Sequence, residues 1–153
     1  SEVFFKEICE LGVPVIVEAD GARRMPCKVP AAHEPVIVPR MTTVCSVYGL
    51  DAIGQRICDC CFRSELAAEV LGKRETDRLE AADLAKIAAD GNGGCKGVKR
   101  GMDHWVILNK ADTDQRKESA EEVCRELERY GNRRILITFS EETERSEMFV
   151  QKQ

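Results

Sequence analysis

The sequence lacks any apolar run near the roughly 20 residues that a membrane-spanning helix needs. Its first residues also lack the basic start and long apolar segment of a secretion signal. A net charge of −4 is far from the basic character of nucleic-acid-binding domains. We therefore expect a cytoplasmic protein with one domain over residues 1–140 and a charged tail over residues 141–153.

The sequence also lacks a second C-x-x-C pair beyond the spacing of Cys58 and Cys61, although it contains eight cysteines. Without a sign of secretion, we expect most of them to be reduced, small and buried. Cys58, Cys60 and Cys61 form one close group, but a thiolate metal site needs a second ligand pair at suitable spacing. A thiol-based selenium or metal carrier is thus one alternative, and a structural cysteine group is the other.

Strand-like and helix-like segments alternate along the chain. Short apolar, β-branched runs at residues 13–17, 42–47, 105–108 and 135–139 predict buried strands. Helical spacing and capping residues predict helices at residues 4–11, 64–71 and 79–89, and from residue 113 or 114 to Gly131. This alternation predicts an α/β fold with a three-layer, mostly parallel sheet.

Parallel strands bring their carboxyl ends to one edge, where open α/β sheets bind ligands. The polar and small residues expected there are Glu18, Asp20, Gly49, Asn109, Asp112 and Ser140. An aspartate at such an edge typically holds Mg²⁺ beside a nucleotide, so Asp20 is a candidate metal ligand and Glu18 a candidate to support it or orient water. The alternative for this stretch is a buried strand followed by a polar turn at Gly21.

Asn109-Lys110-Ala111-Asp112 follows a predicted strand and resembles the base-reading NKxD element of GTP-binding proteins. The Asp112 carboxylate can accept hydrogen bonds from two N–H groups of guanine, which adenine does not offer. The stem of Lys110 can lie over the ring, and Asn109 can connect neighbouring loops. The alternative is a polar strand end that leads into a helix cap.

A phosphate-binding G-x-x-x-x-G-K-[ST] loop is missing. The glycine-rich residues 91–97 follow a helix rather than a strand, and neither Ser nor Thr follows Lys96. Base and ribose contacts alone would bind with about −4 kcal/mol, near the millimolar level. We therefore expect either the C-terminal part of a longer nucleotide-binding domain or a fold that has lost its activity.

A proline-rich stretch over residues 21–40 is too long for a simple turn, and such loops are commonly functional. Its basic residues Arg23, Arg24 and Lys28 could contact phosphate or an anionic cofactor. His33 and Glu34 could form an acid/base pair or provide ligands, although a lone histidine is more often structural.

The runs EADGARRMPCKVPAAHEPVIVPRMTT, VYGLDAIG, FRSELAAEVLG with Arg63, and VILNKAD together resemble the YqeC family. The resemblance implies an amino-truncated P-loop NTPase-like fold and an accessory role in maturing selenium-dependent molybdenum hydroxylases, within selenium cofactor biosynthesis. It also implies Mg²⁺ with GTP or ATP, and a nucleoside triphosphatase activity that this chain alone is expected to lack.

By the same resemblance, Glu18 and Asp20 would serve the metal and catalysis, and Asn109, Lys110 and Asp112 the base. The further residues that match the family pattern, without an assigned role, are Arg23, Lys28, His33, Glu34 and Arg63. The implied partners are a nucleotide and a molybdenum hydroxylase or its cofactor. A non-enzymatic scaffold for a cofactor or partner is the alternative, and an open sheet edge would favour a homo-oligomer.

Overall fold

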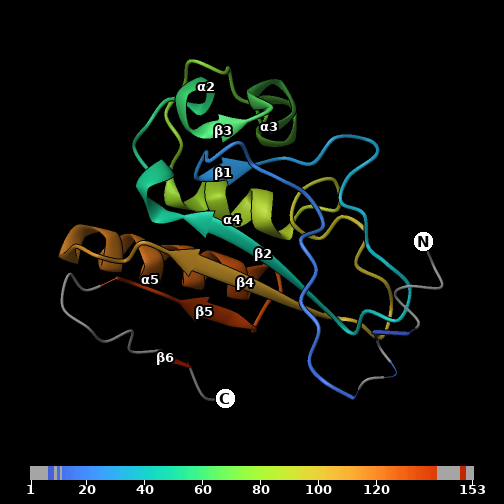
Figure 1. The fold of residues 1–153 in the computed structure, drawn as a ribbon. Coiled ribbons are helices and arrows are strands. Elements are labelled where there is room, and N and C mark those ends of the chain that lie inside the picture. Colours follow the sequence, from blue (N-terminus) through green and yellow to red (C-terminus); the bar gives the residue numbers. More distant parts are fainter. Residues whose placement is uncertain (1–6, 9, 11, 141–148, 151–153) are drawn as a thin grey trace.

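The computed structural model describes residues 7, 8, 10, 12–140 and the backbone of 149–150. Its larger sheet contains β2 (Thr43–Gly49), β4 (Asp103–Asn109), β5 (Ile135–Ile137) and β6 (Phe149–Val150), in the order β2-β4-β5-β6. β2, β4 and β5 are parallel, and β6 is antiparallel to β5. The prediction of an α/β fold with a mostly parallel sheet is confirmed (Figure 1).

The helices form where the sequence has caps and an apolar stripe. α3 (Ser64–Leu71) ends at Gly72, whose left-handed conformation suits a residue without a side chain. α4 (Ala81–Ala89) begins with a capping box between Glu80 and Asp83. In α5 (Asp114–Arg129), the Thr113 side chain accepts a hydrogen bond from the Arg116 N–H. These three helices confirm the predicted segments to within two residues.

The core lies between the larger sheet and the packed pair α4 and α5. It contains Val106 and Leu108 from β4, Leu84 and Ile87 from α4, and Leu127 from α5, all fully buried. The described residues place both of these helices against the same sheet face, so a three-layer arrangement stays a prediction. No helix in the described part of the chain is long and apolar enough to cross a membrane.

A smaller unit contains α2 (Ile57–Cys60) and a two-stranded parallel sheet of β1 (Cys27–Lys28) and β3 (Cys61–Phe62), whereas η1 (Leu50–Ala52) follows β2 and contacts α5. The register pairs Cys27 with Cys61 and Lys28 with Phe62. α3 follows directly and packs against α2. The small sheet therefore joins the proline-rich loop to the amino end of α3.

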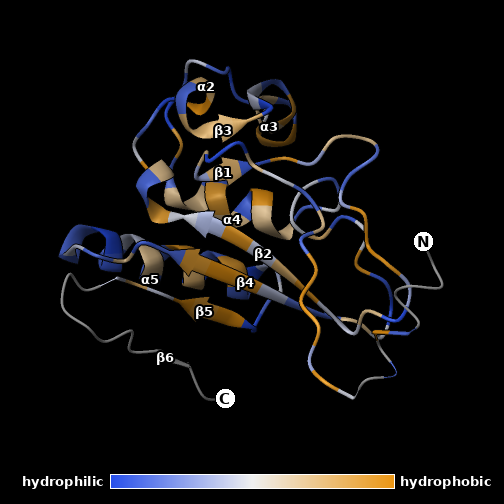
Figure 2. Ribbon diagram, viewed as in Figure 1, coloured by the Kyte–Doolittle hydropathy of each residue, from blue (hydrophilic) through white to orange (hydrophobic). Residues whose placement is uncertain are grey.

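The predicted strand at residues 13–17 is wrong. Residue 13 is a bend, residues 14–20 form no strand with any described residue, and Ile16 is 97% exposed. Figure 2 shows this hydrophobic segment passing in front of the sheet rather than joining it. β-branched residues favour extended backbone, but only a neighbouring strand can turn that backbone into a sheet.

The burial expected for residues 42–47 is also wrong, although the strand itself is confirmed as β2. Thr43, Cys45 and Val47 are exposed, whereas Tyr48 is buried. The strand thus has one covered and one open face. The predicted helix at residues 4–11 lies mostly outside the described residues, of which 7, 8 and 10 are helical. The predicted tail also lies outside them, except for β6.

Gly94 packs so closely that a side chain cannot fit. A Cβ atom there would lie 2.5 Å from the Ala88 carbonyl oxygen and 2.6 Å from the Tyr48 hydroxyl. We expect Gly94→Ala to lower the free energy of unfolding by about 1–3 kcal/mol in urea titrations, because the turn must move off α4. Gly91→Ala, with nothing within 4 Å of its Cβ, is the matched control. Equal stability of the two variants would contradict this packing.

Candidate functional site

The charged residues predicted around the proline-rich loop meet in one ion-pair cluster, formed by Asp20, Lys28, Glu34 and Arg63. The ammonium of Lys28 lies at its centre, with a side chain only 9% exposed. Its Nζ is 3.0 Å from Asp20 Oδ2 and 2.8 Å from Glu34 Oε2, and it donates to the Gly21 carbonyl oxygen at 2.9 Å. Three oxygens therefore surround a single buried cation.

Glu34 is held by a second cation. Arg63 donates from both terminal nitrogens to the two Glu34 oxygens, at 2.6 and 3.1 Å. Hydrogen bonds from Lys28 and then Arg63 lower the pKa of Glu34 to about 2. His33 is mostly exposed, with Nε2 3.8 Å from Glu34 Oε1. Glu34 is thus a fixed carboxylate, and its pKa is far too low for a general base near neutral pH.

The backbone of the small sheet positions this cluster around one aromatic ring. β1 places Lys28 opposite Phe62, and Arg63 follows Phe62 in a left-handed conformation with φ of 63°. Arg23, Lys28 and Arg63 lie over the Phe62 ring at 4.9, 5.8 and 4.4 Å from its centroid. Cations over a ring face are attracted by its quadrupole. Sequence analysis missed Phe62 because the ring gains this role only through the strand register.

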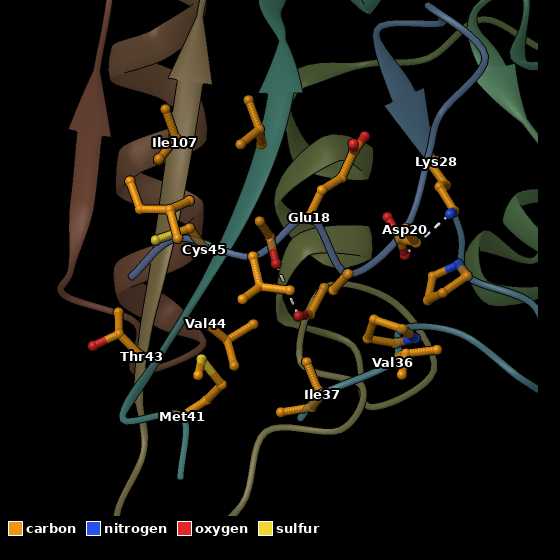
Figure 3. A pocket seen from close by; sticks show the side chains of 18 of the residues that line it. Glu18, Asp20, Lys28, Val36, Ile37, Met41, Thr43, Val44, Cys45 and Ile107 are labelled. Carbon is orange, nitrogen blue, oxygen red and sulfur yellow. Dashed lines mark hydrogen bonds and ion pairs between the residues drawn. The ribbon is translucent and has the colours of Figure 1, made fainter. Parts of the chain in front are cut away.

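A groove of about 740 Å³ lies beside the cluster, between the open face of β2 and the residues preceding β1. Its lining is mostly apolar and includes Val15 and Val17. Val36, Ile37, Val44 and Ile107 also line it (Figure 3). Glu18, Asp20 and Lys28 contribute polar groups at its margin. The exposed Glu18 belongs to this groove rather than to the ion-pair cluster.

The second predicted group, Asn109, Lys110 and Asp112, lies at the carboxyl end of β4. Asn109 Oδ1 accepts hydrogen bonds from the Thr138 hydroxyl at 2.9 Å and the Lys110 N–H at 2.8 Å, so it connects the ends of β4 and β5. Asp112 Oδ1 accepts from the Ser140 N–H at 2.8 Å. Its carboxylate stays partly exposed, with Arg116 at 3.4 Å.

Lys110 adopts a left-handed backbone with φ of 67°, and its Nζ is 2.6 Å from Asp51 Oδ2. The contacts of Asp112 are therefore with the end of β5 and with α5, whereas those of Asp20 are with Lys28. The predicted site residues therefore lie in two groups. Asn109, Lys110 and Asp112 form one group at the carboxyl end of β4, and the ion-pair cluster around Lys28 is the other. Glu18 lies in the groove.

The described residues contain no preformed cage of protein ligands for a metal ion, and magnesium at Asp20 stays a prediction. Asp20 pairs through Oδ2 with the Lys28 ammonium at 3.0 Å. No three Cys, His, Asp or Glu side chains in the described part of the chain are placed to hold a metal ion. Burial raises the pKa of the Cys60 thiol to about 12, which opposes the thiolate that a metal requires.

A polar network that the sequence did not indicate surrounds His104. Its Nδ1 accepts from the Asn132 amide at 3.3 Å and lies 3.4 Å from the Cys95 thiol, so its proton is on Nε2. That nitrogen donates to Ser46 Oγ at 3.0 Å, and the Ser46 hydroxyl donates to the Gly94 carbonyl at 2.9 Å. Because the histidine donates to the serine, Ser46 is not an activated nucleophile.

These features define an α/β protein with a parallel sheet, a carboxyl-end NKxD group and a separate cluster of buried ion pairs. The family model described as YqeC protein matches residues 1–65. The Escherichia coli (strain K12) protein named "Uncharacterized protein YqeC" is 29% identical over 97 residues, which are 63% of this chain and 38% of that relative. Over these residues the chain is similar to the YqeC family. No solved structure matches it.

The low pKa of Glu34 predicts an acid-dependent stability. Its folded pKa of about 2 lies below the ordinary 4.5, so the stabilisation is complete above pH 4.5 and is lost as the pH falls toward 2. We expect Glu34→Gln to lower the free energy of unfolding at pH 7 by about 1.5–3 kcal/mol and to flatten this acid limb in urea titrations. Glu118→Gln, at an exposed position of α5, is the control. An unchanged acid limb in Glu34→Gln would contradict the assignment.

Burial lowers the pKa of His104 below its ordinary 6.5. The unfolded chain then binds the proton more tightly, so stability is full above pH 6.5 and declines as the pH falls below it. We expect His104→Gln to remove this decline between pH 6.5 and 5 in chemical unfolding. His33→Gln, which changes a mostly exposed histidine, should retain it. The same decline in both variants would show that another group titrates.

Proposed function

We propose that this chain is the base-binding part of a nucleotide-binding accessory protein for selenium-dependent molybdenum hydroxylases. The observation that carries the nucleotide part is the Asn109–Asp112 group at the carboxyl end of β4. There the Ser140 N–H orients a partly exposed Asp112 carboxylate. Such a carboxylate can accept hydrogen bonds from the two adjacent N–H groups of guanine.

The accessory role rests on similarity to the YqeC family, and the whole relative's activity is likewise a proposal, since the match covers 38% of its length. The proposed partners are GTP, with ATP as the competing nucleotide, and a molybdenum hydroxylase or its cofactor, in the cytoplasm. The sequence contains no G-x-x-x-x-G-K-[ST] loop, so we do not assign nucleotide hydrolysis to this chain alone. Magnesium would have to arrive with the nucleotide phosphates, because Asp20 pairs with Lys28.

A nucleotide titration followed by amide NMR shifts tests base reading. We expect GTP to shift the amides of Ala111 and Ser140 with a Kd near the millimolar level, and ATP to bind more weakly. Asp112→Asn should abolish the preference for guanine, because an amide presents one donor where two acceptors are needed. The asparagine can still accept from the Ser140 N–H, so the local fold should persist.

Asp114→Ala, which changes an exposed aspartate two residues away, is the matched control and should leave the preference for GTP intact. Equal affinity for GTP and ATP in the unmodified chain would overturn base reading. Unchanged selectivity in Asp112→Asn would also overturn it.

A further inference from the structure

The turn at residues 22–25 places two consecutive arginines in a conformation that arginine rarely adopts. The Met25 N–H donates to the Ala22 carbonyl at 2.9 Å, while Arg23 and Arg24 have φ of 51° and 64°. Positive φ at both central residues is typical of a type I′ turn, where Gly, Asn and Asp dominate. A left-handed conformation costs a side-chain-bearing residue roughly 1–2 kcal/mol. Such strain points to a role for the side chains.

Both guanidinium groups are exposed and available. Arg23 lies over the Phe62 ring, which fixes the plane of its guanidinium without using its N–H groups. Within the residues that the structure describes, neither Arg23 nor Arg24 forms an ion pair. Lys28 and Arg63, in contrast, are already held by Glu34. The two turn arginines are therefore the groups left free to bind a ligand.

The local charge is suited to an anion. Four cations (Arg23, Arg24, Lys28 and Arg63) face two carboxylates (Asp20 and Glu34), which leaves a surplus of two positive charges on a chain of net charge −4. The surplus stays positive when the nearby Glu18 is counted as well. A phosphate group carries −1.5 to −2 near neutral pH, and guanidinium groups bind it in a bidentate manner.

The turn adjoins the apolar groove. Ala22, its first residue, lines that groove. Asp20 and Lys28 line it as well (Figure 3). A volume of about 740 Å³ with a mostly apolar lining is in the range of small-molecule sites. A ligand with an oxyanion at the turn could place an apolar or aromatic remainder in the groove.

We propose that Arg23 and Arg24 form a binding site for the phosphate group of an organic phosphate whose apolar or aromatic body lies in the adjacent groove. The ring of Phe62 and the Lys28–Glu34–Arg63 ion pairs hold the turn in place. The site makes no use of the Asp112 carboxylate, so it goes beyond guanine reading and does not depend on it.

Calorimetry with inorganic pyrophosphate at low ionic strength tests the oxyanion site. We expect the double variant Arg23→Ala/Arg24→Ala to bind at least tenfold more weakly than the unmodified chain. Alanine retains a Cβ and hence the backbone strain, so the melting temperature should change little. Arg125→Ala removes one charge from an exposed position of α5 and should bind as the unmodified chain does. Asp112→Asn should also bind normally, which separates this site from base reading.

Absence of pyrophosphate binding, or equal weakening in Arg125→Ala, would overturn the oxyanion site, the latter by showing only an effect of net charge. Phenyl phosphate tests the groove, since its ring is apolar. It should bind more tightly than inorganic phosphate, and Val44→Asp should remove that advantage while leaving pyrophosphate binding in place. Equal affinities for the two phosphates would overturn the assignment of the groove.

Discussion

The buried ammonium of Lys28 fixes the arrangement on which the candidate site depends. It joins the segment preceding β1, through Asp20 and Gly21, to Glu34 in the proline-rich loop. Glu34 in turn pairs with Arg63 at the start of α3. Removal of one partner from a buried pair leaves an uncompensated charge, which costs more than the intact pair contributes. A loop with little hydrophobic core of its own is thereby held against the small sheet.

The two candidate sites are positioned by different physical means. Backbone pairing of parallel strands brings Asn109 beside Gly49, and hydrogen bonds from the end of β5 orient Asn109 and Asp112. Side-chain charge, in contrast, organises the turn arginines around Phe62. The first arrangement changes little with ionic strength, whereas exposed arginines are sensitive to it. A base-reading group and an oxyanion site can therefore be tested separately in one small chain.

The helix ends, which depend on neighbouring residues in the sequence, were predicted well. The pairing of a strand with a distant strand was not. Ser64–Leu71 ends where Gly72 allows a left-handed cap, and α5 begins at the Thr113 cap, because both features involve only neighbouring residues. The run at residues 13–17 has the same β-branched character as β2 and still forms no strand. The sheet position of β2 depends on β4, which lies more than 50 residues away. Composition alone cannot indicate whether such a neighbour is present.

The sequence by itself determined the helices, the sequence positions of the polar residues that follow β4, and the resemblance to the YqeC family. Only the tertiary structure decided that Lys28 neutralises Asp20, that Phe62 carries a set of cations, and that Arg23 and Arg24 form no ion pair with any described residue. Helix caps and turn residues act over a few positions of the chain. Ion pairs depend on distance in space, and residues 20, 28, 34 and 63 become neighbours only after folding.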